Sequence, residues 1–234
     1  MDRITTELAA ALVAQLRQTP PDTRLIVGVA GSPASGKSSF CHRLVSLVND
    51  SAVPGDPAPA VLVGLDGWHL SRAQLDALPD PRLAHERRGA HWTFDGPGYV
   101  AFVQALRGPA ATVVVKAPTF SHALKDPAPD ALAVHPHHRL VVIEGLYAFL
   151  AIEPWRVAAE LLDERWFLRV EEAEALRRLV KRHVETGICP DEETARQRAE
   201  GNDIPNGKFV VENMLEPTRF IESIDDPVMA HELV

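Results

Sequence analysis

A glycine-rich stretch near the N-terminus carries the clearest chemistry in the sequence. Residues 31–38, Gly-Ser-Pro-Ala-Ser-Gly-Lys-Ser, match the pattern G-x-x-x-x-G-K-[ST]. Glycines in such a loop let backbone N–H groups turn inward around an anion, and the N-terminus of the following helix adds partial positive charge. An apolar run at 25–29 precedes the loop, and a helical pattern follows it to about Val48. This context of strand, loop and helix predicts binding of a nucleoside triphosphate.

Two side chains of this loop have expected roles of their own. Lys37 would reach the β- and γ-phosphates, and the Ser38 hydroxyl would ligate Mg²⁺. The alternative, a glycine-rich turn with a surface lysine, is disfavoured because both flanks fit. The residues expected to bind the nucleotide are Gly31, Ser32, Ala34, Ser35, Gly36, Lys37, Ser38 and Ser39.

Two acidic residues follow apolar runs of the length of buried strands. Asp66 follows residues 61–65, and Glu144 follows residues 140–143. In an open parallel sheet, the carboxyl ends of the strands face the ligand crevice, beside the phosphate loop. One carboxylate there can help to hold Mg²⁺, and another can accept the proton of an attacking hydroxyl. Either acid could instead be an exposed strand-end residue or a helix cap.

The remaining patterns supply the elements that position these groups. Helical periodicity is expected over residues 3–17, 95–106, 172–186, 191–200 and 206–215, with Asp95 as a cap and residues 1–20 as an N-terminal helical segment. Apolar runs typical of buried strands lie at 25–29, 61–65, 112–116, 140–143 and 166–170, with a weaker one at 219–223. Strands alternating with helices predict an α/β fold, a doubly wound and mostly parallel sheet of about five strands with a small helical lid. The whole chain, 1–234, is expected to form one domain.

Composition and charge exclude several classes of protein. The formal net charge of −8 argues against a broad nucleic-acid or anionic-lipid surface. Two cysteines, Cys41 and Cys189, make neither a disulfide framework nor a CxxC metal site, and they fit a reducing compartment. No apolar stretch approaches the roughly 18 residues that span a bilayer, and the first residues lack the regions of a signal peptide. We therefore expect a cytoplasmic protein without nucleic-acid or membrane partners, and a homodimer stays open.

Three segments in chain order resemble one family of enzymes. They are Gly31–Ser38, Leu65-Asp-Gly-Trp-His69 and Ile143-Glu-Gly-Leu-Tyr147, and together they resemble the uridine kinase, type I pantothenate kinase and phosphoribulokinase group. Residues 87–95 are similar to the Arg-Lys-Gly…Asp segment of that group, 120–126 to the Tyr-Ser-His…Asp stretch of bacterial pantothenate kinases, and 177–183 to its arginine-bearing lid helix. The short, tryptophan-bearing version looks like the fructose-transport or nucleoside kinases of the group.

The resemblance implies an ATP-dependent kinase that requires Mg²⁺ and phosphorylates a hydroxyl of a small polar metabolite, which could be a nucleoside, a pantothenate-like acid or a sugar. It implies that Asp66 is the general base and that Glu144 lies near Mg²⁺. Residues 71–95 would form the acceptor-binding segment and 172–205 the lid region, with Arg178 and Arg182 as candidate catalytic arginines. The residues implied to line the acceptor pocket are His69, Arg87, Arg88 and His122.

Some residues depart from the pattern of the group. Trp68 stands in place of Phe, Phe120 in place of Tyr, and His91-Trp92 in place of Pro-Glu. The loss of the tyrosine hydroxyl from the implied pocket argues against pantothenate itself as the acceptor. A protein of another class also stays open, namely a nucleotide-hydrolysing switch or assembly factor without an acceptor. The long segment 71–95 and the absence of an Asn/Thr-Lys-x-Asp motif favour the kinase.

Three lesser features have two interpretations each. The basic stretch at 177–182 is either a solvated helix face or a lid that clamps the transferring phosphoryl group. The histidines at 135, 137 and 138 form either a metal cluster or a polar loop, and their spacing favours the loop. Asn202 and Asn206 either cap a turn or lie near the nucleotide or the lid hinge.

Overall fold

Five parallel strands form the central sheet of the computed structural model, which describes residues 1–108, 113–121 and 123–224. Their order is β2-β5-β1-β6-β7, so β1 lies in the middle. The bounds of the strands are Leu25–Gly31 for β1, Ala60–Gly64 for β2, Leu140–Glu144 for β5, Glu164–Arg169 for β6 and Arg219–Glu222 for β7. All seven residues of β1 are buried, as a strand covered on both faces requires.

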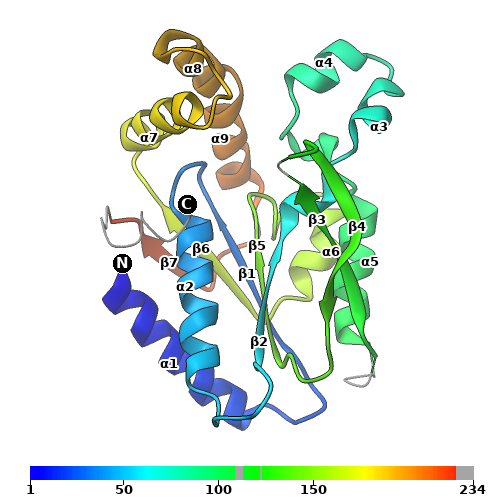
Figure 1. Cartoon of the computed structure of the whole chain (residues 1–234), viewed down its shortest axis with the longest axis vertical. Coiled ribbons are helices and arrows are strands. Elements are labelled where there is room, and N and C mark those ends of the chain that lie inside the picture. Colours follow the sequence, from blue (N-terminus) through cyan, green and yellow to red (C-terminus); the bar gives the residue numbers. More distant parts are fainter. Residues whose placement is uncertain (109–112, 122, 225–234) are drawn as a thin grey trace.

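Helices cover both faces of this sheet (Figure 1). On one face, α1 (Asp2–Gln18) and α2 (Lys37–Asp50) pack on Val27 and Val29. On the other face, α5 (Gly96–Arg107), α6 (Trp155–Glu160) and α9 (Ile204–Asn213) share a core with Ile26 and Ala30. Because successive strand residues point to opposite faces, the one apolar run of β1 contributes side chains to both hydrophobic cores. The predicted doubly wound α/β sheet is confirmed.

Two groups of short helices rise beyond the carboxyl ends of the strands (Figure 1). One holds α3 (Arg72–Asp76) and α4 (Pro81–Glu86), and it lies within the predicted segment 71–95 together with the 3₁₀ turn His91–Thr93. The other holds α7 (Glu172–Glu185) and α8 (Glu192–Arg198). A π-helical turn, Ala199–Asp203, joins α8 directly to α9. The top of the second group is therefore connected to the back of the sheet by one nearly continuous helix.

The prediction of a buried strand at 112–116 is wrong, because the strand begins later and lies outside the central sheet. Thr112 lies outside the described residues, and Val113 and Val114 are exposed. Strand β3 begins at Val115, runs to Ser121 and pairs antiparallel with β4 (Asp126–Val134) in a separate two-stranded sheet. An apolar run has the same appearance in a sheet covered on both faces and in a hairpin that is half covered, so length and composition could not separate the two.

The local helix signals agree well with the structure. The carboxylate of Asp95 accepts a hydrogen bond from the Gly98 N–H at 2.9 Å and caps α5 as predicted. The predicted helix at 206–215 begins earlier, at Ile204, with Pro205 in its first turn. Among the described residues, no helix is both long and apolar enough to cross a membrane.

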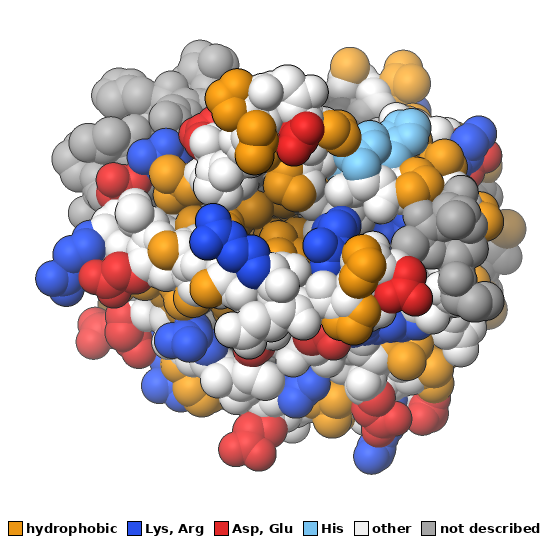
Figure 2. All heavy atoms as spheres, turned by 90° about the horizontal axis from the view of Figure 1, so that it is seen from below, with side chains coloured by type: hydrophobic (Ala, Val, Ile, Leu, Met, Phe, Trp, Pro, Cys, Tyr) orange, Lys and Arg blue, Asp and Glu red, His pale blue; other side chains and the backbone are white. Residues whose placement is uncertain are grey.

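The histidine cluster lies in the turn between β4 and β5. The face seen from below carries one small patch of histidine side chains among mixed charges (Figure 2). The His135 N–H donates to the ring of His138 at 3.0 Å, and burial with the neighbouring histidines lowers the pKa of His138 to about 4. Within the part of the chain that the structure describes, no three His, Cys, Asp or Glu residues are placed to hold a metal ion. The three histidines lie in one turn, where their rings contact one another.

Candidate active site

The phosphate loop connects the central strand to the first turn of α2. Gly36 has φ +81°, a left-handed conformation that glycine adopts without steric cost, and it turns the chain into α2 at Lys37. The Lys37 ammonium donates to the Ser32 carbonyl at 3.1 Å, which folds the side chain back over the loop. Burial lowers the pKa of Lys37, while the nearby charges of Glu144 and Asp66 oppose that shift. The loop thus holds a desolvated cation that faces two acids.

Glu144 and Ser38 meet beside this cation. Strand β5 pairs with β1 so that Glu144 lies opposite Val29, at the edge where the loop begins. The Ser38 hydroxyl donates to Glu144 Oε2 at 3.3 Å. Burial raises the pKa of Glu144, with the charge of Lys37 opposing. A hydroxyl and a carboxylate side by side are the hard oxygen ligands that Mg²⁺ prefers.

Asp66 lies at the end of the neighbouring strand, in the 3₁₀ turn Leu65–Trp68 that follows β2. Its side chain is 66% exposed, so solvent or a ligand can reach the carboxylate. The charge of Asp66 acts on both Lys37 and Glu144. The charges of the two acids therefore act on the same lysine from adjacent strands, and one acid is open to solvent while the other is half-buried.

His69 packs behind Asp66 as part of an aromatic wall. Its ring lies 4.0 Å from the ring of Phe94 and 5.2 Å from that of Phe120, measured between centroids. Nδ1 lies 2.9 Å from the Asp66 carbonyl oxygen, and a carbonyl only accepts, so Nδ1 carries the proton. Burial lowers the pKa of His69 and favours the neutral ring. In that form Nε2 is a hydrogen-bond acceptor.

The two arginines of the acceptor segment have different surroundings. Arg88 donates to the carbonyls of Leu70 and Lys125 and to the carboxylate of Asp126, at 2.7–3.1 Å. Its guanidinium thereby ties the segment to the β3–β4 hairpin, a role that the sequence did not indicate. Arg87 reaches the other way and donates to the Gly201 carbonyl of the π-helical turn at 2.5 Å.

Asp126 is a site-forming residue that the sequence analysis did not single out. Its carboxylate also accepts from the Arg72 backbone N–H at 2.8 Å, and hydrogen bonds from Arg72 and Arg88 lower its pKa. The only signal in the sequence was its position at the end of the stretch 120–126. His122, which the resemblance implied for this pocket, lies outside the described residues.

The lid arginines lie on one helix but contact different groups. Arg178 on α7 donates to the Ala34 carbonyl of the phosphate loop at 3.3 Å and to the Ser223 hydroxyl at 2.9 Å, and it pairs with Glu174. Arg182 is exposed one turn further on, and its charge lowers the pKa of both Lys37 and Glu144. Arg178 is thus engaged with the loop, whereas the charge of Arg182 acts on the centre of the site.

The π-helical turn joins the lid to the acceptor segment. The Asn202 amide donates to the Arg88 carbonyl at 3.3 Å, and the Asn206 amide donates to Asn202 Oδ1 at 3.4 Å. The His183 ring of α7 bonds Asp203 at 3.0 Å. Both asparagines are buried, so they lie at the contact between lid and segment, rather than in a solvated turn.

The comparisons with known proteins agree with this arrangement. The model of the "Phosphoribulokinase / Uridine kinase family" matches residues 26–189. The "ATP-dependent kinase-like protein notR'" of Aspergillus versicolor is 50% identical over 153 residues, covering 64% of this chain and 89% of that protein. A Schizosaccharomyces pombe protein named "Putative uridine kinase C227.14" is 34% identical over 201 residues, 86% of this chain and 84% of its own.

Solved structures share the fold over nearly the whole chain. A structure titled "putative fructose transport system kinase", from Silicibacter sp. TM1040, superposes with a TM-score of 0.77 at 30% identity, covering 91% of this chain and 98% of its own. YFH7 of Saccharomyces cerevisiae has a TM-score of 0.79 at 22% identity, covering 95% and 99%, and shows the fold alone. The family match over most of the chain implies the use of ATP. This chain belongs to the phosphoribulokinase/uridine kinase family of P-loop kinases.

Proposed function

We propose that this chain is an ATP-dependent kinase that transfers the γ-phosphoryl group to a hydroxyl of a small polar metabolite. The observation that carries the proposal is the arrangement around Lys37. The half-buried carboxylate of Glu144, which accepts a hydrogen bond from the Ser38 hydroxyl, and the exposed carboxylate of Asp66 both act on the charge of this lysine. Transfer needs an electrostatic clamp on the phosphates and a separate proton acceptor for the attacking hydroxyl. The two acids differ in exposure in the way that such a division of work requires.

The residues around Ser38 fit a divalent cation. The Ser38 hydroxyl, in the first turn of α2, and the Glu144 carboxylate, at the end of β5, are oxygen ligands side by side, and the charges of Lys37 and Arg182 partly offset the cost of burying Glu144. Mg²⁺ bound there with the nucleotide would supply charge neutralisation on the β- and γ-phosphate oxygens. In this proposal Lys37 stabilises the negative charge that moves onto the phosphates during transfer.

On the acceptor side, Asp66 receives the proton of the attacking hydroxyl. Its exposure leaves room for a substrate oxygen next to the carboxylate. His69, fixed by its bond to the Asp66 carbonyl, offers Nε2 as an acceptor for a second donor group of the substrate. The segment 71–95, held by Arg88 and Asp126, forms the outer wall of this pocket. Phe120, half-buried beside His69, adds apolar surface that can cover one face of a sugar ring or another flat, weakly polar group.

A screen of hydroxyl-bearing metabolites tests the proposal. The purified protein is incubated with ATP, Mg²⁺ and single nucleosides, sugars or polyol acids, and the product is identified by mass spectrometry. We expect ATP consumption that depends on one class of acceptor, and a product heavier by one phosphoryl group. Steady hydrolysis that no metabolite changes would contradict the proposal and favour a nucleotide-dependent switch.

A further inference from the structure

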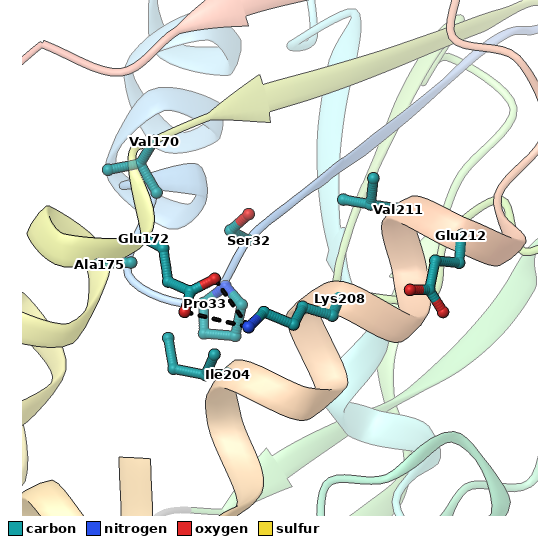
Figure 3. Close-up of a pocket in the computed structure, with 10 residues that line it drawn as sticks. Ser32, Pro33, Val170, Glu172, Ala175, Ile204, Lys208, Val211 and Glu212 are labelled. Atoms are coloured by element: carbon teal, nitrogen blue, oxygen red, sulfur yellow. Dashed lines mark hydrogen bonds and ion pairs between the residues drawn. The ribbon is translucent and has the colours of Figure 1, made fainter. Parts of the chain in front are cut away.

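Helix α9 lies directly against the outer side of the phosphate loop. A cavity of about 220 Å³ opens at this contact, between the loop, the start of α7 and α9. Pro33 of the loop, Val170 before α7 and Ile204 of α9 line it (Figure 3). The Lys208 ammonium of α9 lies 3.0 Å from a carboxylate oxygen of Glu172 and crosses from one helix to the other. The phosphate loop therefore contacts α9 at the rim of this cavity.

Gly207 is the residue through which α9 approaches the loop. A Cβ atom at Gly207 would lie 2.9 Å from Cδ of Pro33 and 3.8 Å from Cγ. A Cβ atom essentially never comes within 3.0 Å of a non-bonded heavy atom, so a side chain at this position forces the proline ring or the backbone of α9 to shift. Cδ of a proline is bonded to its own backbone nitrogen. Displacing the ring therefore displaces the backbone of the phosphate loop.

The two neighbours of Pro33 hold the side chains that matter for nucleotide chemistry. The Ser32 carbonyl accepts from the Lys37 ammonium at 3.1 Å. The Ala34 carbonyl accepts from the Arg178 guanidinium at 3.3 Å. Any shift of Pro33 moves both carbonyls, and with them a phosphate-facing lysine and a lid arginine.

We propose that Gly207 is a positioning residue for the phosphate loop. Because Gly207 has no side chain, α9 can pack directly against Pro33. This contact fixes the positions of the Ser32 and Ala34 carbonyls, which accept hydrogen bonds from Lys37 and Arg178. Since α9 continues from the lid through the π-helical turn, the same contact links the lid to the loop. The inference rests on the proposed binding of ATP by this loop, and the test measures that binding directly.

The experiment is a double-substitution cycle read by titration calorimetry of ATP–Mg²⁺. Gly207→Ala should weaken ATP–Mg²⁺ binding roughly tenfold, the scale of one weakened hydrogen bond to a charged group. In a Pro33→Ala background Cγ and Cδ are gone, and the same Gly207→Ala change should weaken binding by less than about twofold. Such non-additivity reports the contact itself, which a general loss of stability would not reproduce.

Gly201→Ala controls for the effect of an added methyl group in a helix. A Cβ at Gly201 meets nothing within 4 Å, so this variant gains helix propensity without touching the loop. Its melting temperature gives the stability change expected of Gly207→Ala in the absence of a clash.

Each outcome of the cycle decides one question. If the parent protein binds no ATP–Mg²⁺, the proposed function fails. If it binds and Gly207→Ala binds equally well, or weakens binding by the same factor in both backgrounds, the positioning role is overturned. If Gly207→Ala does not fold, the double variant decides, since a folded, ATP-binding double variant supports the contact and an unfolded one contradicts it.

Discussion

The Ser38 hydroxyl donates a hydrogen bond to Glu144 Oε2 across 3.3 Å, which joins the first turn of α2 to the carboxyl end of β5. The two residues are far apart in the sequence and come together because β1 and β5 are neighbours in the sheet. The pair lies beside the half-buried ammonium of Lys37, whose pKa the Glu144 charge raises against the effect of burial. A half-buried acid, a hydroxyl and a cation thus interact with one another at the start of α2.

Neutral substitutions of Asp66 and Glu144 should impair different steps, transfer in the first case and the use of Mg²⁺ in the second. Asp66→Asn keeps the size of the side chain but removes the proton acceptor, so we expect ATP–Mg²⁺ binding to persist while transfer falls by roughly 10²–10⁴. Glu144→Gln should also weaken the response of the rate to Mg²⁺. Calorimetry of ATP–Mg²⁺ binding, together with product formation, separates the two. An Asp66→Asn enzyme with nearly normal turnover would show that another group is the base.

Lys37→Ala tests the phosphate loop itself. The ammonium is preorganised at the loop by its bond to the Ser32 carbonyl. Its removal should lower turnover by roughly 10²–10³, the scale for one preorganised charge donor. Lys37 is half-buried and lies on the loop rather than in either hydrophobic core, so the variant should fold, which circular dichroism can confirm. A folded variant with parental turnover is incompatible with the assigned role.

Glu144 should make the stability of the ligand-free protein depend on pH. Burial raises its folded pKa above the unfolded value, so its contribution is fully present below the unfolded pKa and is lost as the pH rises through the folded pKa. Glu144→Gln removes this loss. We expect the variant to melt at a higher temperature than the parent at alkaline pH, with the difference shrinking toward acid pH. Glu192→Gln, an exposed acid on α8, is the control.

The two lid arginines should have separable effects. Arg182→Ala should lower turnover by roughly 10²–10³ with a smaller effect on ATP binding, because its charge acts on the centre of the site. Arg178→Ala should chiefly weaken ATP binding, because it frees the Ala34 carbonyl of the loop. Arg177→Ala is the matched control, since this arginine pairs with Glu174 on the exposed side of α7. Equal losses in all three variants would leave the stretch as a solvated basic face.

Hydrogen exchange adds a direct test of lid movement. Amides of residues 172–187 should exchange more slowly when a non-hydrolysable ATP analogue and the acceptor are both present. Protection that ligands do not change would argue against closure.

Arg88 should act on the acceptor through the segment that it holds. Arg88→Ala removes the donors that tie Leu70, Lys125 and Asp126 together. We expect a higher KM for the acceptor with little change in the KM for ATP. Arg72→Ala leaves Arg88 on Asp126 and should have a milder effect. An equal rise in the KM for the acceptor and the KM for ATP would contradict a role of Arg88 that is limited to the acceptor.

The sequence predicted the nucleotide side of the site better than the acceptor side. Gly31–Ser38 and the acids after β2 and β5 are local patterns, and parallel strands bring them to one edge of the sheet. The β3–β4 hairpin depends instead on Asp126 and its partners Arg72 and Arg88, which lie about forty to fifty residues away. Strand β4 also begins Asp-Pro-Ala-Pro-Asp, which is typical of a loop. The β-propensity of its residues does not reveal such a strand, because it is held by its partner strand and by ion pairs to distant residues.

The contacts of the lid arginines could not be predicted from the sequence for a similar reason. Three arginines and a lysine on a helical pattern indicated a basic face but not its contacts. What distinguishes Arg178 from Arg182 is the position of α7 over the Ala34 carbonyl, which tertiary packing sets. The continuous run through the π-helical turn was divided into two predicted helices, because Gly201 and Pro205 favour a break.

The central place of β1 also constrains how the protein can be made. Its ladder partners in β5 and β6 follow more than a hundred residues further along the chain. While a ribosome synthesises the protein, the fully apolar strand Leu25–Gly31 therefore emerges long before either neighbour exists. Such late, non-local pairing slows folding and exposes nascent chains to aggregation. The phosphate loop, which directly follows β1, therefore also lacks its neighbouring strands until β5 and β6 have been synthesised.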